Sequence, residues 1–177
     1  MRFLTLGLAL LLTACAQAVD QAEQPRPLPA FSQTGADAWL NGPPLTVDDV
    51  RGKVLLVDVW TFGCWNCYRS FPWLNAMEKR LAGEDFLVIG IHSPEFAHER
   101  EAAAVAAKIE KFGLQHPVML DNDFAYWRAL ENRYWPAFYL VDREGMIRHV
   151  HVGETHAGDA QAEQIEERIR ALLAEQR

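Results

Sequence analysis

The run from Lys53 to Trp60 constrains the fold more than any other segment of the chain. Its sequence, KVLLVDVW, is apolar after the first residue except for one carboxylate, Asp58. A strand buried on both faces has such a continuous apolar run, whereas a half-exposed strand alternates apolar and polar residues. The run therefore predicts a central strand covered on both faces, with Asp58 as an anomalous charged group inside it.

A helix is predicted directly after this strand. Phe71, Leu74, Met77 and Leu81 recur at helical spacing, Gly83 provides a stop, and a proline inside the helix predicts a kink. The sequence Cys-Trp-Asn-Cys at residues 64–67 thus lies where the strand passes into the helix.

This position favours a reactive Cys64. A sulfur at the start of a helix lies near unpaired backbone N-H groups and the positive end of the helix dipole, which stabilises the thiolate. Thiolates in such motifs have pKa values of roughly 3.5 to 7.5, against about 8.5 for free cysteine. Cys67, one turn further into the helix, is expected to be more buried and to keep a higher pKa.

Strands and helices alternate through the rest of the chain. Ser93 and Pro94 are predicted to begin a second helix, as N-cap and first helical residue, that ends at Gly113. The other predicted elements are strands near 86–91, 117–120, 137–141 and 146–152 and helices near 124–132 and from about 159. This order predicts an α/β fold with a central mixed sheet.

The first residues indicate export. Arg2 precedes an apolar run from Phe3 to Leu12 that is too short to span a bilayer, and small residues follow. Leu-Thr-Ala-Cys15 resembles a bacterial lipobox, in which cleavage leaves the cysteine as the lipid-bearing N-terminus. Ordinary cleavage after Ala18 also fits, but the place of Cys15 directly after the apolar run favours lipidation.

We therefore divide the chain into a lipoprotein signal peptide at residues 1–14, a flexible tether at 15–30 and a folded domain at 31–177. The tether contains three prolines and little large apolar surface. We expect the protein in the bacterial cell envelope, anchored by lipid to a membrane, with the outer membrane favoured, and facing the periplasm. The alternative is a soluble periplasmic protein. A net charge of -7 without a basic run argues against nucleic acid as a partner.

The three cysteines fit an oxidising compartment if Cys15 is lipidated or removed. The remaining pair lies too close in sequence to close a long loop, so stabilising the fold is not its expected purpose. Zinc needs further Cys or His ligands, which the six histidines do not supply at a metal-ligand spacing, and Tyr68 stands where covalent haem requires histidine. We expect no metal and no cofactor.

Together these segments resemble the exported TlpA/ResA-like branch of the thioredoxin-like proteins, and the DipZ-type thioredoxin domain. The resemblance covers roughly residue 31 to the C-terminus. It is carried by VDVWTFGCWNC at 57–67 with a proline five residues later, GIHSPEF at 90–96, LDND at 120–123, WPAFYLVD at 135–142 and HVGE at 151–154. It implies a thioredoxin fold, with an inserted helix-strand element before a cis-proline strand.

The resemblance also implies a mechanism. Cys64 matches the cysteine that attacks a partner disulfide, and Cys67 matches the one that resolves the mixed disulfide. Asp58 matches a buried carboxylate that accepts a proton from Cys67, although a structural hydrogen bond at the strand end is the alternative. Pro136 matches the cis-proline beside the redox-active disulfide, and Trp135 is then the residue whose backbone pairs with a substrate.

Two further residues have alternative roles. Glu95 matches a glutamate that approaches the cysteines in the ResA-like branch, but the first turn of a helix also suits it on dipole grounds, and this capping role is preferred. Trp65, inside the motif, either packs on a partner near the reactive sulfur or covers the helix end.

The predicted function is thiol-disulfide exchange with protein dithiols and disulfides, and with a redox partner, by a monomer. A thiol peroxidase is one alternative, because Thr61-x-x-Cys64 resembles the peroxiredoxin element. A copper-handling thioredoxin-fold module, with both thiolates as Cu(I) ligands, is the other.

Overall fold

The computed structural model describes residues 24–175. The predicted signal peptide at 1–14 and Cys15 lie outside the described residues. Between residues 24 and 175, seven strands form one sheet with the order β1-β7-β6-β3-β4-β5-β2, and the sheet is mixed, as predicted. The strands are β1 (Arg26–Pro27), β2 (Trp39–Leu40), β3 (Val54–Trp60), β4 (Phe86–His92), β5 (Val118–Leu120), β6 (Ala137–Val141) and β7 (Met146–Val152).

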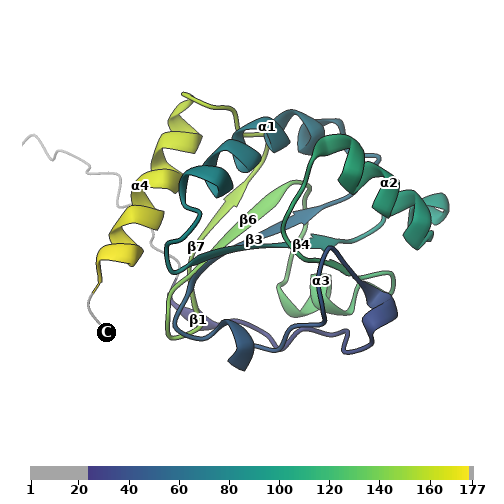
Figure 1. Cartoon of the computed structure of the whole chain (residues 1–177), viewed down its shortest axis with the longest axis horizontal. Helices are drawn as coiled ribbons and strands as arrows, with labels where there is room; N and C mark the ends of the chain where they lie inside the picture. Colours follow the sequence, from purple (N-terminus) through teal and green to yellow (C-terminus); the bar gives the residue numbers. More distant parts are fainter. Residues whose placement is uncertain (1–23, 176–177) are drawn as a thin grey trace, which may run out of the picture.

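Helices cover both faces of the sheet (Figure 1). They are α1 (Trp65–Arg80), α2 (Ala102–Phe112), α3 (Ala125–Ala129) and α4 (Ala160–Ala174), with 3-10 turns η1 (Ala36–Ala38), η2 (Asp48–Val50) and η3 (Ala97–Arg100). One apolar core, between the sheet and α1, α2 and α4, contains Cys67. The other core lies under α3 and the N-terminal segment. The central strand β3 is buried along its whole length between these two cores, which is why it needs no polar face.

The pairing of β3 determines which residues meet at its end. It runs parallel to β4, with Asp58 opposite Gly90, and antiparallel to β6, with Val59 opposite Ala137. The carboxyl end of β3 therefore lies beside the amino end of β6. This brings the Cys64 segment and Pro136 to the same edge of the sheet.

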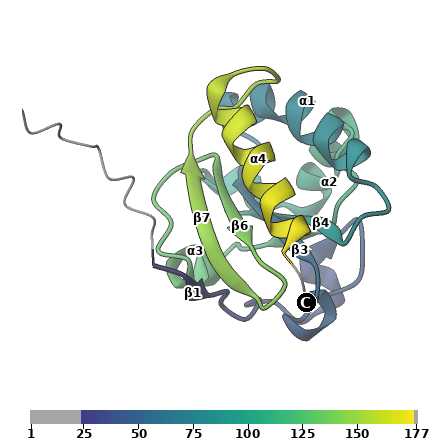
Figure 2. The same cartoon turned by 90° about the vertical axis from the view of Figure 1, so that its left-hand side faces the viewer.

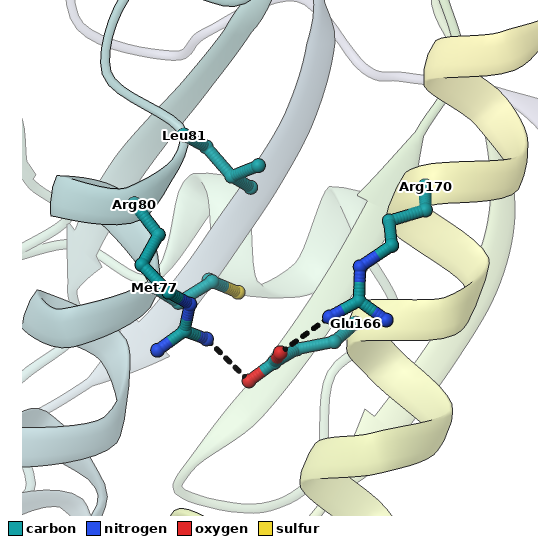
Figure 3. A pocket seen from close by; sticks show the side chains of 5 residues that line it. All are labelled: Met77, Arg80, Leu81, Glu166 and Arg170. Atoms are coloured by element: carbon teal, nitrogen blue, oxygen red, sulfur yellow. Dashed lines mark hydrogen bonds and ion pairs between the residues drawn. The ribbon is translucent and has the colours of Figure 1, made fainter.

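Helix α4 packs beside α1 on one face of the sheet (Figure 2). It begins at Ala160, close to the predicted start at about residue 159, and the side chain of its N-cap, Asp159, accepts a hydrogen bond from the backbone of Ala162. Figure 3 shows the Glu166 carboxylate between Arg80 of α1 and Arg170 of α4, at N···O distances of 2.6 and 3.0 Å. Exposed ion pairs contribute only about 0.2–1 kcal/mol, so the buried Ile165 and its neighbours hold this helix more than the charges do.

The prediction of a flexible tether is wrong for the last residues of that segment. Arg26–Pro27 pairs with β7, Leu28 is buried, and the Arg26 guanidinium donates to the carbonyl of Leu130 at 2.7 Å. The proline-rich composition argued against order, but this short segment needs no core of its own because it completes the edge of an existing sheet.

The predicted start of the second helix is also wrong. Ser93 is buried at the end of β4 and donates its hydroxyl to Asp121 at 2.9 Å, so it is not an N-cap. Helix α2 begins only at Ala102, after η3, and ends at Gly113, whose φ of 68° confirms the predicted stop. Helix α3 is shorter than the predicted 124–132.

Candidate active site at the start of the first long helix

A disulfide joins Cys64 and Cys67, with 5.3 Å between their Cα atoms. Cys64 is the N-cap of α1, and its sulfur accepts a hydrogen bond from the backbone N-H of Cys67 at 3.1 Å. The Cys67 side chain is buried, whereas Cys64 is partly exposed. An incoming thiolate or disulfide therefore has access to Cys64 first.

Asp58 is buried on the side of β3 that faces this helix. It shares that side with Leu56 and Trp60, which belong to the same core as Cys67. It is 1 % exposed, and neither carboxylate oxygen has a hydrogen-bond partner in the described part of the chain. Burial raises the pKa of Asp58 to about 8, because the low-dielectric core disfavours its charged form. The predicted structural hydrogen bond at the strand end is not found among residues 24–175.

A second buried carboxylate, Glu99, lies under the loop before Cys64. One of its oxygens accepts hydrogen bonds from the Thr61 hydroxyl and from the backbone of Glu95 at 2.7 Å and Phe96 at 3.3 Å. A Cβ atom added to Gly63 would press on the other oxygen, so this carboxylate lies directly against the loop before Cys64. Sequence reasoning missed Glu99, because it lies in a charged run, His-Glu-Arg-Glu, that is typical of a solvated surface.

Glu95 does not fill either role considered for it. Its side chain is exposed, and its backbone rather than its carboxylate contacts Glu99. No helix begins at Glu95, since η3 starts at Ala97 and α2 at Ala102, so the preferred capping role is wrong. The glutamate of this inserted region that approaches the cysteine loop is Glu99.

His92 supports the same loop from β4. Its Nε2 accepts a hydrogen bond from the backbone N-H of Phe62 at 3.3 Å, and its ring packs on Trp60 and Phe62. Burial lowers the pKa of His92 to about 4, while the nearby Glu99 opposes this shift only in part. The ring is therefore neutral at physiological pH, as an acceptor at Nε2 requires. Nothing in the sequence distinguished His92 from a core histidine.

Pro136 lies at the same edge of the sheet. The peptide bond between Trp135 and Pro136 is cis, the geometry that the resemblance implied. The Trp135 indole donates to the carbonyl of Ser93 at 3.1 Å and packs on Trp127, with ring centroids 4.3 Å apart. Trp65 is 69 % exposed, so it does not pack over the helix end as a buried cover.

Within residues 24–175, the His, Cys, Asp and Glu side chains form no group of three that would hold a metal ion. The helices of this part are all too short or too polar to cross a membrane.

A sheet of this order, with a cis-proline beside a dithiol at the start of a helix, defines the thioredoxin-fold class. The sequence profile of the Redoxin family matches residues 23–166, and the chain belongs to this family. This membership confirms the resemblance inferred from the residues. The domain also begins earlier than residue 31 in this match, in agreement with the ordered residues 26–28.

Individual relatives agree. Protein DipZ of Mycobacterium tuberculosis is 37% identical over 81% of this chain, which spans only 21% of that protein. The thiol-disulfide oxidoreductase YkuV of Bacillus subtilis is 27% identical and covers 85% of this chain and 96% of its own. The solution structure of a thioredoxin-like protein in the oxidised form, 27% identical, superposes with a TM-score of 0.72 over 86% of this chain and 98% of its own.

Proposed function

We propose that the protein exchanges electrons with protein dithiols and disulfides through Cys64 and Cys67. The observation that carries the proposal is the difference between the two sulfurs, since Cys64 is accessible at a helix N-terminus and Cys67 is buried behind it. Cys64 attacks a partner disulfide, and a mixed disulfide forms as the partner thiolate leaves. Cys67 then attacks Cys64, which closes the intramolecular disulfide and releases the reduced partner.

Asp58 is the proposed proton acceptor for Cys67. It lies on the sheet face that packs against α1, in the same core as the buried sulfur. With no hydrogen-bond partner among the residues that the structure describes and a pKa of about 8, Asp58 in its carboxylate form is basic enough to take the Cys67 proton.

Exposed aromatic side chains adjoin the cysteine motif, its loop and the cis-proline segment, and they form the proposed substrate surface. Trp65 follows Cys64 directly, Tyr134 precedes the cis-proline segment, and a Phe96 ring carbon lies 3.6 Å from the Cβ position of Gly63. Trp135 and Pro136 provide the backbone for an extended partner. An apolar segment around the target disulfide would bury these rings.

Insulin reduction tests the mechanism. With dithiothreitol as electron donor, the purified protein should reduce the insulin disulfides, and Cys64→Ser should abolish the activity. Cys67→Ser should retain the first attack and accumulate mixed disulfides, visible as bands that disappear on reduction. Full activity of Cys64→Ser would exclude the mechanism.

The two alternatives have direct tests. The Thr61 hydroxyl, which would belong to a peroxidase element, donates to Glu99 instead. Peroxide consumption measured beside insulin reduction separates peroxidase from exchange activity. Titration of the reduced protein with Cu(I), with and without Cys64, tests copper binding.

We also propose that the protein is exported and carries lipid on Cys15, with the domain facing the periplasm. The support is the short apolar run followed by Leu-Thr-Ala-Cys. Mass spectrometry of the mature N-terminus should find a lipidated Cys15. An unmodified chain that begins at Val19 would instead indicate a soluble periplasmic protein.

A further inference from the structure

Three polar side chains with unpartnered atoms lie deep in the core that contains Cys67. Both oxygens of Asp58, Nε1 of Trp60 and Nε2 of His116 are buried and have no hydrogen-bond partner among the described residues. His116 is 1% exposed, and the exchange mechanism above does not use it. Buried polar atoms are costly to leave unpaired, so a group of them in one region indicates a function.

Two of these atoms lie beside Gly90 of β4. A Cβ atom at this glycine would stand 3.1 Å from Nε1 of Trp60 and 3.3 Å from Nε2 of His116, with a methyl carbon of Val118 at 3.0 Å. Asp58 is opposite Gly90 in the parallel ladder, so its side chain leaves the same face of the sheet from a backbone only about 4.8 Å away. A larger residue at position 90 would press on Trp60, His116 and Val118.

His116 is oriented by a carboxylate on its other side. Its Nδ1 lies 3.1 Å from Oε2 of Glu78 in α1. A carboxylate accepts hydrogen bonds, so Nδ1 carries the proton, and in the neutral ring Nε2 is a base that faces Gly90. Glu78 is partly exposed and lines a surface depression of about 450 Å³ together with Asn75, Lys79 and Gln115.

These contacts describe a route from the solvent to Asp58. A carboxyl with a pKa of about 8 is mostly protonated at neutral pH, and in that form it accepts no proton from Cys67. It must first deliver its own proton to another base. Nε2 of His116 is a base without a partner in the described part of the chain, and it lies beside Gly90, the residue opposite Asp58 in the ladder.

We propose that His116 is a positioning residue that acts through Asp58, taking the Asp58 proton so that Asp58 can accept the proton of Cys67. This inference rests on the proposed exchange function. The proton passes from the Asp58 carboxyl to Nε2 through water, because the two groups are not in direct hydrogen-bond contact, and the charged imidazole releases its Nδ1 proton to Glu78 and the solvent. Cys67 then gives its proton to the Asp58 carboxylate as its sulfur attacks Cys64, so the net step moves one proton from Cys67 to solvent.

Other titratable groups near this core have different partners. His92 accepts from the loop backbone, and Glu99 is hydrogen-bonded to Thr61. Tyr68 packs on Phe112, and burial and Glu99 raise its pKa, so it stays neutral. Lys79 lines the surface depression together with Glu78.

A single-turnover reaction with dithiobis(nitrobenzoate) tests the proposal, because each attack releases one coloured nitrobenzoate thiolate. The first phase reports the attack of Cys64 on the reagent disulfide. The second reports the attack of Cys67 on the mixed disulfide. In the full reduced chain, His116→Gln should leave the first phase unchanged and slow the second by about tenfold near pH 7. This is less than the roughly 10²–10⁴-fold contribution of a general base, because His116 acts only through Asp58. The deficit should shrink above pH 8, where Asp58 has no proton to give.

Two further variants complete the experiment. Glu78→Gln should slow the second phase less than His116→Gln does, with the same dependence on pH. If circular dichroism shows that His116→Gln is not folded, Glu78→Gln tests the relay in its place. Glu110→Gln, which removes an exposed carboxylate from α2, should behave as the unaltered chain. Folded variants with an unaltered second phase, or with a slowing that does not depend on pH, would overturn the relay. Absence of a second phase in the unaltered chain would instead contradict the proposed exchange function.

Discussion

The Thr61 hydroxyl donates a hydrogen bond to the buried carboxylate of Glu99, and this contact joins the loop before Cys64 to the turn η3. The same oxygen of Glu99 accepts from two backbone N-H groups of residues 95–96. A single carboxylate thus holds together two segments that are 38 residues apart in the sequence. The loop that presents Cys64 depends on a residue outside the cysteine motif.

Glu99→Ala should therefore destabilise the protein. The substitution leaves the Thr61 hydroxyl and the backbone donors without their acceptor, at a cost of about 1–3 kcal/mol for a buried unsatisfied group. Denaturant unfolding measures the change. Glu95→Ala is the matched control, because it removes an exposed carboxylate four residues earlier and should change the free energy of unfolding by less than about 0.5 kcal/mol. Equal losses in the two variants would contradict the anchoring role of Glu99.

The Asp58→Asn variant should become more stable than the unaltered protein as the pH rises. The Asp58 pKa is about 8 in the folded protein, above its value of 3.8 in the unfolded chain, so the unfolded state binds fewer protons between these values. Stability therefore falls with rising pH in this window, by up to roughly 1.4 kcal/mol per pH unit from this group alone. Asparagine removes the slope. The free energies of unfolding of the two proteins should differ more at pH 8 than at pH 5. An equal difference at both pH values would show that Asp58 ionises freely.

The same substitution should slow the attack of Cys67 on the mixed disulfide. Asparagine cannot accept the thiol proton, so the rate should fall by roughly 10²-fold or more near neutral pH, in the range for loss of a general base. In the unaltered protein the rate should rise with pH up to about 8, as the Asp58 carboxylate forms. Stopped-flow rates across pH provide the comparison. An unaltered rate with reduced stability would assign Asp58 a structural role.

Leu28→Ala should destabilise the domain although Leu28 lies in a proline-rich segment. The side chain is buried in the core beneath α3, and such truncations cost about 2–5 kcal/mol. Val152→Ala, at an exposed position of β7, is the control and should cost much less. Thermal unfolding of both variants measures the difference. A negligible effect of Leu28→Ala would restore the interpretation of residues 24–30 as a flexible tether.

Local patterns accounted for the elements that position the cysteines. The apolar run at 53–60 and the helical spacing after it predicted β3 and α1, because each pattern reports burial within one continuous segment. The resemblance then implied the cis geometry before Pro136. Where a residue had a tertiary partner outside its segment, as Ser93 has in Asp121, the local interpretation was wrong.

Local patterns in the sequence predicted the strand-cysteine-helix unit, the mixed sheet and an unusual carboxylate at Asp58. Long-range packing places Glu99, rather than Glu95, under the cysteine loop, and brings Nε2 of His116 beside Gly90, the residue opposite Asp58 in the ladder. Such positions escape local patterns because burial of a polar side chain depends on what packs against it from elsewhere in the chain. A charged run has the same sequence pattern at the surface and under a loop, and only long-range packing distinguishes the two.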